Sequence, residues 1–155
     1  MKRLLLVLSI LAGSMLANAQ QELLELARSD IRSARMGLVA AAMELTPEQQ
    51  EVFWPLYRQY ANEQDALLEN RMEMLKQFAR NYENMSDATA HSIAEQSFDI
   101  QRARMKRREN YFEKFSEALG PVLAARFIQV DGQISTLLDF ELMKATPLIT
   151  PPVGE

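Results

Sequence analysis

The sequence predicts an all-α protein. After residue 19, apolar residues recur at steps of three and four, which places them on one face of a helix, and no useful run alternates with the period of two typical of a strand. The 155 residues include only five Gly and six Pro, too few for the turns of a many-stranded sandwich or barrel. Apolar residues make up 48% of the chain and charged residues 25%, which is a globular composition, and the length suits one domain.

Residues 1–19 have the organisation of a cleavable signal peptide. Two basic residues follow Met1, an apolar run occupies 4–12, and Ala-Asn-Ala at 17–19 provides a cleavage site. We therefore expect the mature chain to begin at Gln20 and the protein to be exported, with a bacterial periplasm as its compartment. The apolar run is too short for a membrane span of about 20 residues, so we expect no integral membrane segment after cleavage.

We expect residues 20–146 to form a single helical domain of four helices, and residues 147–155 to form a Pro-rich C-terminal tail. The apolar stripe of the first helix consists of Leu24, Ala27, Ile31, Ala34, Leu38 and Ala41. The stripe of the fourth helix consists of Leu123, Phe127, Val130, Ile134 and Leu137.

Helix boundaries follow from capping residues. Thr46 can cap a helix that starts at Pro47 and runs to about Asn84, since a Gln lies three residues after the Thr as a capping box requires. Ser86 caps the next helix. Gly120-Pro121 ends that helix and starts the last one.

The two central helices are expected to form a long antiparallel hairpin, because the link at 85–87 is short. Pairing residues whose numbers sum to about 172 brings two polar pairs together, Arg71 with Gln101 and Gln64 with Arg108. Such layers fix the register, since a slip would leave a guanidinium unpaired in the seam. The expected seam of the second hairpin helix consists of Ala94, Phe98, Met105, Phe112, Phe115 and Leu119.

Composition argues against most catalytic and metal sites. Without Cys, the chain has no disulfide, thiolate nucleophile, Cys-based zinc site or iron–sulfur cluster. His91, the single His, has Glu95 four residues later; together they could supply two metal ligands, but zinc requires three or four, so we favour a capping or seam histidine. No Gly-rich phosphate loop is present. We expect no enzyme activity, no metal and no cofactor.

The mature chain is acidic. Loss of the two leading basic residues leaves 15 Lys and Arg against 21 Asp and Glu, a net charge of −6. Because phosphate contacts require local positive charge, we expect no nucleic-acid partner.

The stretch Leu45-Thr46-Pro47-Glu48-Gln49 matches the LTxxQ signature, at the start of a long helix after a signal peptide. On this motif, carried by Leu45, Thr46, Pro47 and Gln49, the chain resembles the Spy/CpxP family of periplasmic proteins, as a divergent branch. The equivalent stretch at 119–123 keeps only the Leu and the Pro of the family's second copy. The resemblance implies a cradle-shaped α-helical dimer whose concave face holds unfolded clients, or an adaptor acting on an envelope-stress sensor.

A second apolar line on the third helix is a candidate client-binding surface. Ile93, Ile100 and Tyr111 share this line, and Arg104 and Arg107 lie beside it. Apolar patches flanked by guanidinium groups suit loose contact with unfolded chains that present apolar and acidic segments. The alternative is that the line packs on a neighbouring helix or a partner subunit.

Two functions from different classes remain. The first is a periplasmic, ATP-independent chaperone-like protein that binds unfolded or stress-exposed envelope proteins. The second is an adaptor that docks one envelope-stress partner and has no general chaperone activity. Suppression of aggregation of several unrelated denatured proteins without nucleotide would distinguish the first from the second.

Overall fold

The computed structural model describes residues 29–149, and the chain divides into two compact units, 1–42 and 43–155. Residues 29–43 are helical. Ile31 and Leu38, two members of the apolar stripe expected for this segment, are exposed. Leu24 and Ala27, like the signal peptide, lie outside the described residues.

The second unit contains the long helices. They are α2 (Pro47–Asn81), which continues into the short 3₁₀ helix η1 (Tyr82–Asn84), then α3 (Asp87–Leu119) and α4 (Pro121–Ala145). With the helix at 29–43, these confirm the predicted all-α fold of four helices, and residues 29–149 contain no strand. No helix in this range is both long enough and apolar enough to cross a membrane.

The helix ends lie where the capping residues place them. Thr46 Oγ1 accepts a hydrogen bond from the Gln49 backbone N–H, and Gln49 Oε1 accepts one from the Thr46 backbone N–H at 2.9 Å, which completes the capping box. Ser86 Oγ caps α3 by accepting from the Thr89 N–H at 3.2 Å. Gly120 joins α3 to α4 at φ 88°, a conformation that glycine adopts at little cost.

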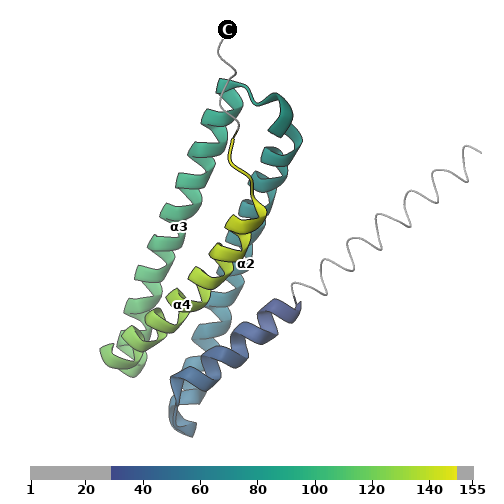
Figure 1. Ribbon diagram of the computed structural model, residues 1–155. Helices are drawn as coiled ribbons and strands as arrows, with labels where there is room; N and C mark the ends of the chain where they lie inside the picture. The colour runs from purple at the N-terminus through teal and green to yellow at the C-terminus, as the bar shows by residue number, and fades with distance from the viewer. Residues whose placement is uncertain (1–28, 150–155) are drawn as a thin grey trace, which may run out of the picture. The chain divides into compact units, whose positions relative to one another are not determined.

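The α2–α3 hairpin is antiparallel, and its register agrees with the prediction to within about one residue. Gln96 Nε2 donates to Gln77 Oε1 at 2.8 Å near the link between the helices. Farther along, the rings of Tyr60 and Tyr111 lie 5.1 Å apart. Figure 1 shows α4 starting beside the end of α3 and running diagonally across the hairpin towards α2.

The aromatic core lies at the end of the bundle where α2 begins and α3 passes into α4. Phe127 of α4 is fully buried against Phe53 of α2 and Phe115 of α3, with ring centroids 5.6 and 4.5 Å away. Near this end the Arg108 side chain of α3 reaches α4, since a Cβ on Gly132 would lie 2.9 Å from Arg108 Nη2. Tight aromatic packing therefore fixes the first half of α4 on the hairpin.

The predicted seam of α3 is wrong in its central part. Phe98 and Met105 are each 56% exposed, whereas Ile93 and Tyr111 are buried and Ile100 is half-buried. Phe115 is the member of the predicted seam that is fully buried. The helix is turned by about one residue, or about 100°, relative to the predicted face.

Candidate functional site

A layer of polar side chains crosses the interior between α2, α3 and α4. Tyr60 donates its hydroxyl hydrogen to Asp131 Oδ2 at 2.6 Å, and each of these residues is only 1% exposed. Arg108 Nε lies 3.7 Å from the same carboxylate. The buried Arg107 donates to Gln64, and its guanidinium carbon lies 4.6 Å from the centroid of the Tyr60 ring. Each of the three helices contributes to this layer, so it fixes their mutual position.

The ionisation of the layer follows from its burial. Burial, and next the neighbouring Asp131 carboxylate, raise the pKa of Tyr60 well above its usual value, so the phenol stays protonated and can donate. Burial and the hydrogen bond to Glu63 raise the pKa of Tyr111 to about 12. Arg107 Nε and Nη1 are buried without a hydrogen-bond partner, and the face of the Tyr60 ring provides the cation with electrostatic compensation.

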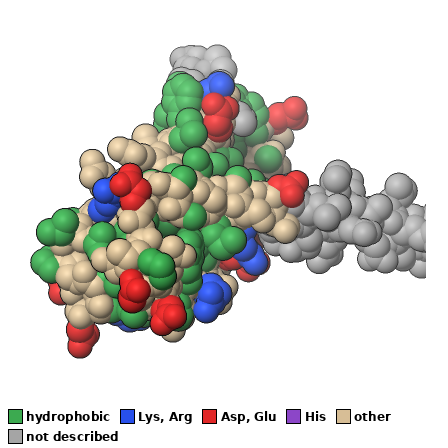
Figure 2. Space-filling model, turned by 90° about the horizontal axis from the view of Figure 1, so that it is seen from below, with side chains coloured by type: hydrophobic (Ala, Val, Ile, Leu, Met, Phe, Trp, Pro, Cys, Tyr) green, Lys and Arg blue, Asp and Glu red, His purple; other side chains and the backbone are tan. Residues whose placement is uncertain are grey.

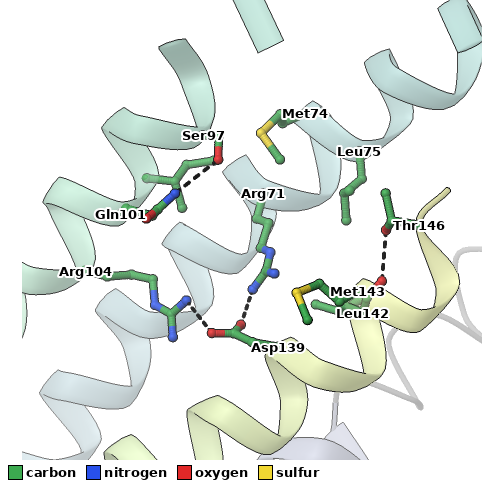
Figure 3. Close-up of a pocket in the computed structure, with 11 residues that line it drawn as sticks. Arg71, Met74, Leu75, Ser97, Gln101, Arg104, Asp139, Leu142, Met143 and Thr146 are labelled. Atoms are coloured by element: carbon green, nitrogen blue, oxygen red, sulfur yellow. Dashed lines mark hydrogen bonds and ion pairs between the residues drawn. The ribbon is translucent and has the colours of Figure 1, made fainter. Parts of the chain in front are cut away.

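A second charged cluster lies farther along the bundle. Arg71 of α2 and Arg104 of α3 converge on Asp139 of α4 (Figure 3). Arg71 Nη1 bonds one carboxylate oxygen, and Arg104 Nη1 bonds the other at 2.9 Å. Partial burial alone would raise the pKa of Asp139, but the hydrogen bonds and charges of the two arginines outweigh it and hold that pKa below its usual value.

The cluster forms part of the wall of a cavity of about 340 Å³. The apolar lining of this cavity comes from all three helices and consists of Met74, Leu75, Ile100, Leu142 and Met143. Gln101, Ser97 and Thr146 add polar groups. A second cavity, of about 370 Å³, shares Leu75, Leu142 and Thr146 with the first. Both cavities lie in the half of the bundle beyond the polar layer.

The structure separates the predicted client-binding residues into two groups. Ile93, Arg107 and Tyr111 are buried, so the expectation of an exposed line is wrong for these three, and the alternative of packing against other helices applies. Ile100 and Arg104 are half-buried and line the cavity. The reason is that α3 turns its arginines towards acceptors on α2 and α4.

The two predicted Arg–Gln pairs are also wrong. Arg71 bonds Asp139, while Gln101 bonds Ser97 of its own helix. Gln64 does meet an arginine of α3, but it is Arg107 rather than Arg108.

Several large apolar side chains are exposed on α3 and α4. We define the outer apolar surface as Phe98 and Met105 of α3 with Leu137 and Phe140 of α4. Viewed from below, Figure 2 shows hydrophobic side chains at the surface with acidic and basic side chains between them. The seven-residue spacing of Phe98 and Met105 is visible in the sequence, but it indicates a seam as readily as an exposed stripe.

The LTxxQ motif serves as a helix start. Thr46, Pro47 and Gln49 form the cap and first turn of α2, and Leu45 directly before them is half-buried. In the described structure the motif's polar groups bond one another, so its evident role is to fix where α2 begins.

His91 is neither a cap nor a seam residue. Its Nε2 lies 3.3 Å from Glu95 Oε1, and both side chains are exposed. Within residues 29–149, no group of three or more His, Cys, Asp or Glu side chains could hold a metal ion.

The comparisons with known proteins bear on the family. Searches among curated proteins and among solved structures gave no match. The model of the LTXXQ motif family matches residues 31–122, which include the capping box, all of α2 and all of α3. The match covers more than half of the chain and agrees with the Spy/CpxP-like resemblance drawn from the motif. The chain therefore belongs to the LTXXQ motif family.

Proposed function

We propose that the protein is a periplasmic, ATP-independent chaperone-like protein that binds unfolded or stress-exposed envelope proteins. The observation that supports this proposal most directly is the outer apolar surface on a member of the LTXXQ motif family. Phe98 and Met105 lie two turns apart on one face of α3, and exposed apolar faces of this kind commonly bind other proteins. The proposal replaces the line through Ile93 and Tyr111 with this surface as the client site.

The surroundings of the outer apolar surface suit weak, reversible contacts. Exposed charges of both signs flank Phe98 and Met105 on α3: Asp99, Arg102, Lys106 and Glu109. On α4, Lys144 Nζ lies 5.5 Å from the centroid of the Phe140 ring. Methionine side chains adapt to differently shaped partners, and flanking charges speed encounter with charged segments. Neither feature requires nucleotide.

The test is aggregation of several unrelated denatured proteins, with and without this chain and in the absence of nucleotide. The unmodified chain should suppress aggregation of most of them at near-stoichiometric ratios. The variant with Phe98→Ser and Met105→Ser should lose most of that suppression while its stability changes by less than about 0.5 kcal/mol per site, as at exposed positions generally. Val122→Ser, which alters another exposed apolar side chain, 80% exposed at the start of α4, is the control.

Two results would contradict the proposal. In the first, the unmodified chain suppresses no aggregation but binds one purified envelope-stress protein with a defined stoichiometry, which is the adaptor function. In the second, Val122→Ser lowers suppression as much as the α3 double variant does, which would show that any exposed apolar residue serves equally.

The periplasmic location makes a separate prediction about processing. Cleavage after the Ala-Asn-Ala site at 17–19 should give an exported protein whose first residue is Gln20. N-terminal sequencing of the protein recovered from the periplasmic fraction measures this. A chain recovered there that still begins at Met1 would contradict the signal-peptide assignment.

We also propose a homodimer, on the strength of the family resemblance. Sedimentation equilibrium over a range of concentrations tests it, and a single monomeric mass throughout would contradict it.

A further inference from the structure

We propose that the cavity between α2, α3 and α4 binds a single-chain anionic amphiphile, an alkyl carboxylate such as decanoate, with Arg71 and Arg104 holding the carboxylate. This site is distinct from the outer apolar surface, and the inference does not depend on the proposed chaperone function.

The charge balance of the cavity favours one anionic group. Two guanidinium groups face a single carboxylate, that of Asp139, which leaves one positive charge uncompensated within the cluster. Each guanidinium carries five N–H donors and gives one of them to Asp139, so donors remain on both. A second carboxylate placed between them could accept hydrogen bonds from both arginines, the geometry that guanidinium groups bind best.

The apolar lining favours an alkyl chain on that anion. Beyond the arginines the wall is formed by Met74, Leu75 and Leu142, as Figure 3 shows for the residues drawn around Asp139. A second cavity borders the same Leu75 and Leu142 and is lined mainly by apolar and aromatic side chains: Phe78, Ala79, Tyr82 and Pro147.

The length of the combined cavities distinguishes an alkyl chain from a peptide end. Along α2 and into η1, the lining runs from Arg71 to Tyr82, which spans about 16 Å at the helical rise. The C-terminal residue of a peptide would place its carboxylate at the arginines but would fill only the first cavity. An unbranched alkyl chain that passes along Leu75 and Leu142, which border both cavities, would reach the second one.

The experiment is isothermal titration of the whole mature chain with hexanoate, octanoate and decanoate, each below its micelle-forming concentration. Affinity should rise about tenfold for every two methylenes added, because each buried methylene contributes to transfer from water. Decanol and decyltrimethylammonium, which have the same chain and no carboxylate, should bind at least tenfold more weakly than decanoate. An N-acetylated peptide ending in Leu should also bind more weakly.

Substitutions in the charged cluster should have opposite effects. Arg71→Gln and Arg104→Gln should each weaken decanoate binding by about tenfold or more, the effect of losing one charged hydrogen bond. Asp139→Asn should strengthen it, because the carboxylate that competes for both arginines is gone. Arg102→Gln alters an exposed arginine of α3 outside the cavity and is the matched control. A purely structural role for the cluster would instead make all three cluster variants bind more weakly.

Methyl resonances of methionine place the bound decanoate. Met74 and Met143 line the cavity, whereas Met105 lies on the outer apolar surface, so decanoate should shift the first two and leave the third unchanged. If the arginine variants do not fold, these shifts and the sign of the Asp139→Asn effect still decide. The proposal is overturned if decyltrimethylammonium binds as well as decanoate, if Met105 shifts in parallel with Met74, or if Asp139→Asn weakens binding.

Discussion

Replacing Phe127 with Ala is expected to lower the free energy of unfolding by about 3–5 kcal/mol, the range for truncating a buried aromatic side chain. Phe127 has no exposed surface, and its ring contacts aromatic rings from both other helices. The centroids of Phe53, Tyr60 and Phe115 lie 5.6, 5.1 and 4.5 Å from its own. Two contributions lower the free energy of unfolding. The variant no longer gains the free energy of transferring the ring from water into the core, and it leaves a cavity between three helices that rigid neighbours fill only in part.

Urea denaturation followed by circular dichroism measures this effect. Phe140→Ala is the control on the same helix, because Phe140 is half exposed and its truncation should cost less than about 0.5 kcal/mol. Equal losses for Phe127→Ala and Phe140→Ala would show that the aromatic cluster is not the core of this bundle.

Replacing Asp131 with Asn is expected to lower the free energy of unfolding by about 3 kcal/mol or more. The carboxylate is buried, accepts from Tyr60 at 2.6 Å and lies 3.7 Å from Arg108 Nε. The amide has nearly the same shape but no charge. It therefore leaves the partly buried Arg108 guanidinium without the carboxylate that lies 3.7 Å from its Nε. Removing one partner of a buried charge pair lowers the stability of the fold by more than the intact pair contributes, because the other charge stays buried without a partner.

A double-mutant cycle isolates the Tyr60–Asp131 contact. Tyr60→Phe and Asp131→Asn combined should cost less than the sum of the two single changes, with a coupling of about 0.5–3 kcal/mol. Asp99→Asn, on an exposed carboxylate of α3, is the control and should combine additively with Tyr60→Phe. Additivity of the Tyr60 and Asp131 changes would show that the buried hydrogen bond contributes nothing measurable.

The helix ends could be predicted because local chemistry decides them. The Thr46 capping box, the Ser86 cap and the Gly120-Pro121 junction each act within a few residues, so no knowledge of the rest of the fold is needed. The hairpin register was predictable for a similar reason, since a link of a few residues leaves little room for a slip.

The buried face of α3 could not be predicted in the same way. The helix carries two apolar lines at heptad spacing, one through Phe98 and Met105 and one through Ile93 and Ile100, and both are long enough to be a seam. Apolar periodicity cannot choose between them, because the choice depends on partners from another helix. Burying the second line also brings Arg104 within 2.9 Å of Asp139.

The two Arg–Gln pairs were predicted wrongly because the prediction paired only α2 with α3, whereas α4 also supplies hydrogen-bond acceptors. Asp131 and Asp139 both belong to α4, which follows the hairpin in the sequence. Asp131 pairs with Arg108, and Asp139 pairs with Arg71. The prediction had paired both arginines with glutamines of the hairpin. A signal was present, since Asp131 interrupts an apolar helix stripe, and a buried carboxylate requires a cation.

The position of the aromatic core at one end of the bundle has a consequence for the protein's motions. Local opening of a protein costs least where few buried apolar contacts must be broken. Beyond the polar layer, the end of α4 near Leu142 lies over cavities, whereas its first half is held by the Phe127 cluster. The end of α4 can therefore swing away from α2 while the aromatic half stays closed. Such partial openings would expose the lining of both cavities without global unfolding.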